Sequence, residues 1–193
     1  VSLVESPMKE THKAVLKLAK KNHAIISFDP NIRLPLWSSA EACQETVREF
    51  LPYADLVKLS DEECFFVTGK HCILDAADWL FEQGCKMVLY SMGKEGAMIL
   101  TPHFSSHVEN PEVRVKDTTG AGDAIIGAYL YCLAKNHITV SQLADCLPEQ
   151  VQEWLTFAVY YANYSITKSG AIASYPDYTT FVKWMQEKRK KAH

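Results

Sequence analysis

The sequence of 193 residues has no Cys-x-x-Cys pair and no apolar run long enough to cross a membrane, and its first residues are not expected to be a signal peptide. Its six cysteines stand apart from one another, several in apolar stretches, which predicts reduced thiols rather than a disulfide framework or a zinc site. The net charge of −3 gives no broad basic surface for nucleic acid. These absences favour a soluble, cytoplasmic enzyme or binding module with neither nucleic acid nor membrane as a partner.

Strand and helix patterns alternate along the chain. The first helix is expected to have Ser6 as its N-cap and Pro7 at its first position. Its core-facing residues are expected to be Met8, Val15, Leu16 and Ala19. Strands are predicted at residues 23–29, 55–60, 86–92, 96–101 and 113–116, and helices at about 39–51, from residue 61, and at 74–83.

This alternation is typical of an α/β fold, a doubly wound and mostly parallel sheet with helices on both faces. Ligand sites in such folds lie at the carboxyl ends of the strands. Gly93-Lys94-Glu95 predicts a tight turn between two of the strands, and the chain is expected to be mostly helical after residue 116. No linker or internal repeat divides the sequence, so residues 1–193 are expected to form one domain.

Residues 117–123, Asp-Thr-Thr-Gly-Ala-Gly-Asp, stand directly before a long apolar run with helical spacing. They lack the Walker A pattern, and Ile125 takes the place of the third glycine in the dinucleotide fingerprint. What remains is an anion cradle at a helix N-terminus, built from the amides of Ala121, Gly122 and Asp123. Asp123 would then be the base that takes a proton from a substrate hydroxyl. The alternative is an acid that only favours the first turn of its helix.

The stretch 117–123 resembles the C-terminal signature of the ribokinase-like (PfkB) family of carbohydrate kinases. The segment SFDPNIRLPLW at 27–37 is similar to the fructokinase branch, and residues 54–69 and 167–176 follow the family's order. The resemblance implies a ribokinase-like fold and transfer of phosphate from ATP to a sugar hydroxyl, with Mg²⁺ and K⁺ as cofactors. It also implies that a glycine-rich sugar-binding part and a lid belong ahead of the region matched here, and that the complete protein is a homodimer.

The resemblance assigns roles to single residues around the motif. It makes Asp123 the catalytic base and Gly120, Ala121 and Gly122 the anion hole. Glu63 lies on the family's Asn-x-x-Glu motif, which organises Mg²⁺ and phosphate, although Ser60 replaces the Asn. Ser60 to Glu63 is also a good capping box, and the two interpretations of Glu63 stay open.

Nucleotide contacts are implied for four residues, Ser91, Gly93, Ala162 and Asn163. Val159 stands where many members of the family have Asn. The tyrosines of the same segment follow helical spacing and are expected to be core rather than pocket walls; they are Tyr160, Tyr161 and Tyr164.

Substrate binding is implied for Asn31 and Arg33, which follow the predicted strand at 23–29, and the guanidinium suits a polyhydroxyl or anionic ligand. The alternative is a surface turn shaped by two prolines. For K⁺, the resemblance points to the backbone carbonyls of Asp117 and Thr119, with groups near Ala171 and Ser174.

Three kinds of function stay open. The first is a sugar kinase, with fructose favoured over ribose, a nucleoside or 2-keto-3-deoxygluconate. The second is a non-catalytic module with the kinase fold, and the third, which Ile125 argues against, is the nucleotide domain of a dehydrogenase. The basic run 188–191 is expected to be a solvated helix end.

Overall fold

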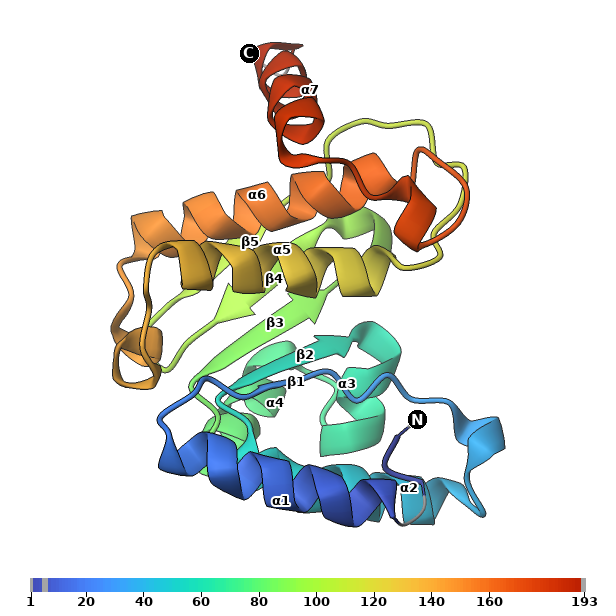
Figure 1. Ribbon diagram of the computed structural model, residues 1–193, viewed down its shortest axis with the longest axis vertical. Helices are drawn as coiled ribbons and strands as arrows, with labels where there is room; N and C mark the ends of the chain where they lie inside the picture. The colour runs from blue at the N-terminus through green and yellow to red at the C-terminus, as the bar shows by residue number, and fades with distance from the viewer. Residues whose placement is uncertain (1, 5–6, 192–193) are drawn as a thin grey trace. The chain divides into compact units, whose positions relative to one another are not determined.

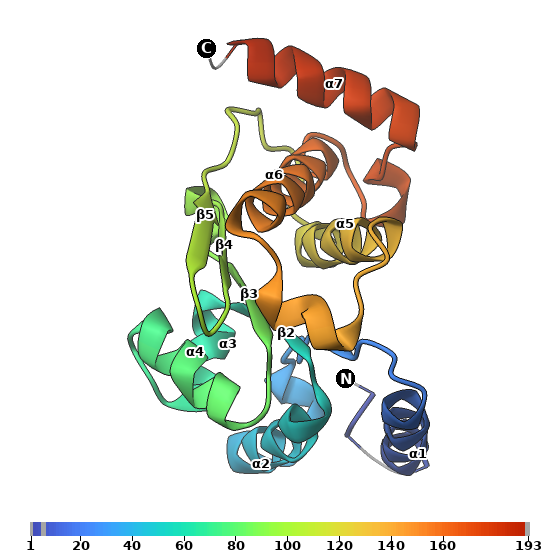
Figure 2. The ribbon, with the colours of Figure 1, turned by 90° about the vertical axis from the view of Figure 1, so that its left-hand side faces the viewer.

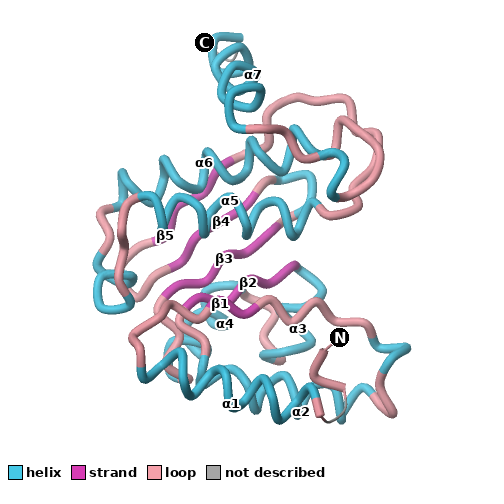
Figure 3. The backbone as a smooth tube through the Cα atoms, in the orientation of Figure 1, coloured by secondary structure: helices cyan, strands magenta, loops and turns pink. Residues whose placement is uncertain are grey.

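The computed structural model describes residues 2–4 and 7–191 and has an α/β fold built on a five-stranded sheet (Figures 1 and 3). The order of the strands in the sheet is β1-β2-β3-β4-β5. Both β1 with β2 and β2 with β3 pair in parallel, and Leu56 lies opposite Met87 in the second pair. The strands are β1 Ser27–Phe28, β2 Leu56–Ser60, β3 Met87–Ser91, β4 Ala97–Leu100 and β5 Ser105–Val108.

Seven α-helices accompany the described strands. They are α1 Met8–Lys21, α2 Ala40–Phe50, α3 Asp61–Thr68, α4 Ile73–Glu82, α5 Ala121–Lys135, α6 Pro148–Ser165 and α7 Tyr178–Lys191. The predicted α/β class and most of its elements are confirmed. None of the helices in the described part of the chain combines the length and the apolar character that a bilayer crossing requires.

The chain divides into two compact units. The first consists of Val1–Met92, Met98–Ser105 and Ile138–Cys146, and the second of Gly93–Ala97, Ser106–His137 and Leu147–His193. The first unit therefore contains α1 to α4 with β1, β2 and β3, and the second contains α5, α6 and α7.

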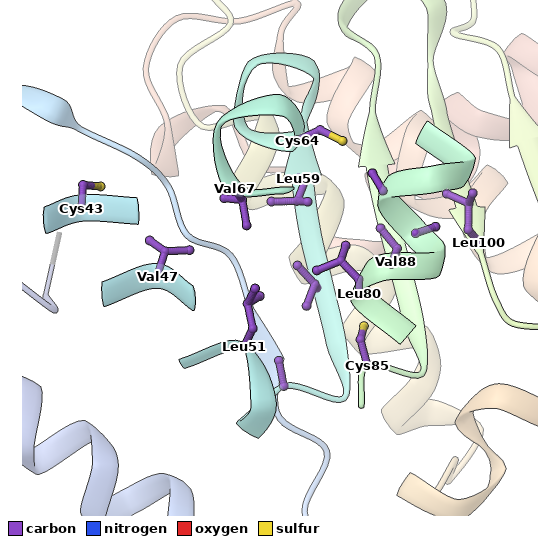
Figure 4. Close-up of a cluster of buried hydrophobic side chains, with 14 residues drawn as sticks. Cys43, Val47, Leu51, Leu59, Cys64, Val67, Leu80, Cys85, Val88 and Leu100 are labelled. Atoms are coloured by element: carbon purple, nitrogen blue, oxygen red, sulfur yellow. The ribbon is translucent and has the colours of Figure 1, made fainter. Parts of the chain in front are cut away.

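The core of the first unit gathers side chains of β2 and β3 with those of α2, α3 and α4 (Figure 4). Leu59, Leu80 and Val88 have no exposed surface. Strand β2 is almost entirely buried, as expected for a parallel strand covered on both faces. Lys58 interrupts its apolar run and is itself buried.

Helix α1 differs from its prediction. Ser6 lies outside the described residues, and Pro7 is the N-cap rather than the first helical residue. The helix has no buried residue, and Met8 and Val15 are exposed, so the predicted core-facing stripe is wrong. Two lysines of α1 instead form ion pairs with α2.

Glu49 of α2 makes both of the contacts that carry this charge pairing. Its Oε2 lies 2.7 Å from Nζ of Lys9, and its Oε1 lies 2.6 Å from Nζ of Lys13. Exposed ion pairs of this kind add little stability. Helix α1 is therefore weakly attached through this face.

The strand predicted at residues 113–116 is also wrong, because this segment has no strand pairing and β5 lies earlier, at Ser105–Val108. The backbone of Lys116 and Asp117 instead donates to the carbonyl of Ile166 at the end of α6. In β5, alternate residues are buried, and the strand approaches the start of β4 so closely that a Cβ on Gly96 would lie 2.0 Å from the carbonyl oxygen of Val108. Alternation over only four residues is a weak signal in a sequence.

The second unit packs α5 beside α6, as Figures 1 and 2 both show. Tyr164 of α6 and Phe181 and Met185 of α7 form a buried cluster, and Tyr160 and Tyr161 pack against it. The expectation that the tyrosines are core rather than pocket walls is confirmed for Tyr164, and Tyr160 is half-buried against the same cluster. It is wrong for Tyr161, which also lines a hollow beside α5.

Candidate active site

The candidate site in the second unit is the N-terminus of α5. Gly120 is the N-cap, and its carbonyl accepts the first helical hydrogen bond, from the amide of Ala124 at 2.8 Å. The amide of Ala121 donates to the carbonyl of Thr118 at 3.1 Å, so it is not one of the unpaired donors that the sequence predicts. Gly122 and Asp123 occupy the second and third helical positions, where a helix offers its amides no acceptor. With the positive end of the helix dipole, these two amides are suited to binding an anion.

Gly120 is required by its surroundings. Its φ of +79° is in the left-handed region that favours glycine. A Cβ at this position would lie 2.7 Å from the hydroxyl of Tyr175 and 2.9 Å from Cβ of Ala171. Tyr175 also donates its hydroxyl hydrogen to the Gly120 carbonyl at 2.9 Å. The start of α5 is thereby fixed against the 171–175 segment.

Asp123 is exposed and stands at the rim of a hollow of about 320 Å³. The hollow runs along the face of α5 that carries Gly127 and Tyr131, at spacings of four residues from Asp123, and its other walls are aromatic. Those walls are Phe157, Tyr161, Tyr175, Tyr178 and Phe181. Burial raises the pKa of the Tyr175 phenol, and the charge of Asp123 raises it further. The sequence did not predict this hollow, although the four-residue spacing of Asp123, Gly127 and Tyr131 is visible in it.

Asp117 ties the motif to the loop after α6. Its Oδ1 accepts from the amide of Thr119 at 2.9 Å, and its Oδ2 accepts from the amide of Gly170 at 2.8 Å. These donors, Gly170 first, lower the pKa of Asp117 to about 2. The Asp117 carboxylate therefore stabilises the contact between the motif and the loop after α6. This role does not depend on a cation at the Asp117 backbone carbonyl.

The four residues predicted for K⁺ belong to segments that the structure brings together. Gly120 and Gly170 join the 117–120 and 170–174 segments through the contacts just described. The carbonyl of Ala171 already accepts from the amide of Ser174 at 3.1 Å and from its hydroxyl at 2.6 Å. Backbone carbonyls are suitable ligands for a hard cation, so the segments fit K⁺ in their chemistry.

A chain of amides links the residues predicted for the nucleotide in this unit. Asn163 is buried in α6 and donates to Oδ1 of Asn110 at 2.7 Å and to the carbonyl of Val159 at 2.9 Å. Asn110 in turn donates to the carbonyl of Gly93 at 2.8 Å. Val159 and Ala162 are both buried in α6. Asn110 was missed, because no local pattern marks a loop amide that pairs with a residue 53 positions away.

In the first unit, Glu63 is buried at the start of α3. The predicted capping box is confirmed, because the Ser60 hydroxyl accepts from the Glu63 amide at 3.4 Å and Oε2 of Glu63 accepts from the Ser60 amide at 3.0 Å. Oε1 accepts from the amide of Ile32 at 3.0 Å. Burial alone raises the pKa of Glu63, but the charge of Lys58 and the hydrogen bonds outweigh it and leave the pKa lowered. A fixed, ionised carboxylate of this kind fits Mg²⁺ through water.

Lys58 lies between two carboxylates. Its Nζ is 3.2 Å from Oδ2 of Asp29 and 3.8 Å from Oε2 of Glu63. Burial raises the pKa of Asp29, and Lys58 only partly opposes this. Lys58 was not predicted, although a lysine inside an apolar strand is a visible signal.

Three further predicted residues lie in the first unit. Asn31 has a φ of +44° and donates its amide to Oδ1 of Asp29 at 3.1 Å. Arg33 is exposed, and its guanidinium donates to the carbonyl of Ile32 at 2.9 Å. Ser91 ends β3, and its hydroxyl donates to the carbonyl of Leu59 at 3.4 Å.

Comparison with known proteins matches residues 2–178 to the pfkB family of carbohydrate kinases. The chain belongs to this family. It is 34% identical over 177 residues to fructokinase-2 of Solanum habrochaites, a match that covers 91% of this chain and 52% of the relative. It is 35% identical over 191 residues to a probable fructokinase-5 of Arabidopsis thaliana, covering 98% of this chain and 57% of the relative. The chain thus spans about half the length of these curated relatives.

Solved structures of the family share the fold. A fructokinase with bound ATP from Xylella fastidiosa superposes with a TM-score of 0.89 at 26% identity, over 96% of this chain and 59% of that one. A fructokinase double mutant from Vibrio cholerae, with fructose, ADP and potassium bound, gives a TM-score of 0.84 at 28% identity, over 95% of this chain and 57% of that one. The predicted ribokinase-like fold and the fructokinase-like branch are confirmed.

Proposed function

We propose that this chain supplies the nucleotide-binding and phosphoryl-transfer part of an ATP-dependent sugar kinase of the cytosol, with fructose as the preferred acceptor. The observation that carries the proposal is the position of Asp123. It joins a carboxylate to the free amides of a helix N-terminus, the two groups that transfer of phosphate to a hydroxyl requires. Curated relatives that are fructokinases, and a neighbour structure with fructose and ADP bound, support the choice of sugar.

The reaction follows from the roles of these groups. The amides of Gly122 and Asp123 donate to oxygens of the γ-phosphoryl group and stabilise the charge that builds up on them. The carboxylate of Asp123 takes the proton of the sugar hydroxyl as the new O–P bond forms and the bond to the β,γ-bridging oxygen breaks. ADP leaves with that oxygen. Mg²⁺ neutralises the phosphates when it is bound, and Glu63 is the carboxylate that would hold its water shell.

The remaining predicted residues take the roles that the family resemblance gives them. We assign contacts with the nucleotide to Ser91, Gly93, Ala162 and Asn163. We assign Asn31 and Arg33 to the sugar. K⁺ would be bound by carbonyls of the 117–119 and 171–174 segments, and bound potassium in a fructokinase structure supports this assignment.

The test is an assay of the longest polypeptide that the gene encodes, with ATP and Mg²⁺ against fructose, ribose, adenosine and 2-keto-3-deoxygluconate. We expect the highest kcat/KM with fructose. Preference for a nucleoside would overturn the choice of sugar. Nucleotide binding without phosphorylation of any acceptor would favour the non-catalytic module.

A further inference from the structure

A buried lysine lies beneath the segment that we assign to the sugar. Lys58 is on β2, and its side chain is 9% exposed between the carboxylates of Asp29 and Glu63. Asp29 follows β1 and Glu63 begins α3, so the three charges come from three separate elements. With both acids ionised, the cluster has one negative charge in excess.

Stability alone is a poor reason for such a cluster. Removing charges from water costs free energy that their mutual attraction often fails to recover, and apolar replacements of the same volume are frequently as stable. Every other residue of β2 up to Leu59 is apolar and buried, so an apolar side chain would fit the strand. A reason for the buried lysine is therefore sought in the groups to which the two carboxylates are hydrogen-bonded.

Both carboxylates hold the backbone of the same short segment. Asp29 accepts from the amide of Asn31 at 3.1 Å, and Glu63 accepts from the amide of Ile32 at 3.0 Å. Asn31 has a φ of +44°, a conformation that costs energy for any residue with a side chain and that is common at ligand sites. Two consecutive amides are thus fixed by acids whose shared counter-ion is Lys58.

We infer that Lys58 is a positioning residue, which fixes Asp29 and Glu63 and through them holds Asn31 and Arg33 in the orientation that binds the sugar. This inference rests on the proposed function only in naming the sugar as the ligand of the segment. Without the ammonium group, the two acids repel each other and release the amides. The strained turn at Asn31 then relaxes, and the sugar loses a preformed contact surface.

The experiment compares Lys58→Met with the wild type, both made in the longest polypeptide that the gene encodes. Its control is Lys86→Met, which removes a half-buried lysine of the same unit whose Nζ donates to the Val140 carbonyl at 2.9 Å, away from the 29–33 segment. Hydrogen exchange of the Asn31 and Ile32 amides measures how firmly the carboxylates of Asp29 and Glu63 hold the segment. Kinetics measure KM for the sugar, and calorimetry measures nucleotide affinity.

For Lys58→Met we expect exchange at both amides to rise at least about tenfold and KM for the sugar to rise by about 10- to 100-fold. Nucleotide affinity should change by less than about threefold, and Lys86→Met should leave all three quantities near wild type. Unchanged exchange in Lys58→Met would overturn the positioning role. Raised exchange with an unchanged KM would overturn the link to the sugar.

If Lys58→Met does not fold, Lys58→Arg carries the test, because it keeps the charge but places it in a larger, planar group. We then expect smaller increases in exchange and KM, because the charge is kept but displaced from the two carboxylates. A raised KM with unchanged exchange at both amides would contradict the inference. A protein that phosphorylates no sugar at all would contradict the proposed function. The exchange measurements would still decide whether Lys58 holds the segment.

Discussion

The hydroxyl of Tyr175 donates a hydrogen bond to the carbonyl oxygen of Gly120 at 2.9 Å, across 55 residues of sequence. Gly120 is the N-cap of α5, and Tyr175 also lines the hollow at whose rim Asp123 stands. This hydrogen bond therefore connects two parts of the candidate site. One is the start of α5, whose amides are proposed to bind an anion, and the other is the wall of the hollow beside the proposed base. Three predictions depend on this arrangement.

Gly120→Ala should disturb the start of α5. A left-handed backbone costs an L-residue about 1–2 kcal/mol, and the new Cβ would also meet Tyr175 and Ala171. We expect a lower melting temperature and a nucleotide affinity at least about tenfold weaker. Gly127→Ala is the matched control, because nothing lies within 4 Å of its Cβ, and alanine should stabilise the helix interior by about 0.5–1 kcal/mol. Equal behaviour of the two variants in melting and titration would contradict the steric argument.

Tyr175→Phe should remove one hydrogen bond while keeping the aromatic wall. We expect a loss of about 1 kcal/mol in the free energy of unfolding and a larger proportional fall in kcat than in nucleotide affinity. Tyr161→Phe is the control, because that hydroxyl bonds to the Pro176 carbonyl at 3.3 Å and not to the motif. A kcat no lower than that of the control would show that the contact does not support the base.

Asp123→Asn tests the base itself. The amide cannot accept the proton of the sugar hydroxyl, so turnover should fall on the order of 10²–10⁴-fold. The helix amides remain, and removal of a negative charge beside them should leave ATP binding intact or slightly tighter. Turnover is measured by ADP release and binding by calorimetry. Wild-type turnover would leave Asp123 as no more than a favourable first-turn acid.

The sequence predicted best the features that are encoded locally. The capping box of Ser60 and Glu63, the buried strand β2 and the start of α5 after Gly120 follow from neighbouring residues or from the apolar pattern. The errors arose where distant contacts decide. Lys116 of the segment 113–116 donates to the Ile166 carbonyl after α6 instead of pairing with a strand. In α1, Met8 and Val15 are exposed, and Leu16 and Ala19 are only half-buried.

In the candidate site, too, the local features were predictable and the long-range contacts were not. The motif 117–123 and its helix were predictable because glycine, helix dipole and carboxylate act within a few residues of one another. Lys58, Asn110 and Tyr175 were not, because each acts on a partner brought to it by the fold. The amide of Ala121 was assigned wrongly as a free donor, since the tight turn to Thr118 engages it.

Asn163→Leu tests the amide chain in the second unit. Leucine has the same branched shape and the same number of non-hydrogen atoms but cannot donate to Asn110 or to Val159, so the loop that carries Asn110 and Gly93 should loosen. We expect ATP affinity to fall by about 5- to 50-fold, which corresponds to about 1–2.3 kcal/mol. Asn136→Leu is the control, because its side chain bonds only within α5, to the Cys132 carbonyl at 2.8 Å. Equal affinity in both variants would exclude Asn163 from nucleotide binding.

The last prediction concerns the 193-residue chain on its own, which spans about half the length of its curated relatives. It has the anion site and the proposed base, but a kinase also has to fix the acceptor hydroxyl in line and exclude water, and much of its rate comes from that positioning. Strand β1 stands at an edge of the sheet, and Met8, Val15 and Leu18 of α1 are exposed. Open strand edges and exposed apolar surface favour association. We therefore expect weak nucleotide binding, little sugar phosphorylation and oligomers or aggregates when the chain is compared with any longer polypeptide that the gene encodes, by activity assay and light scattering. Full activity from a monodisperse monomer of residues 1–193 would show that these residues suffice to bind and position the sugar.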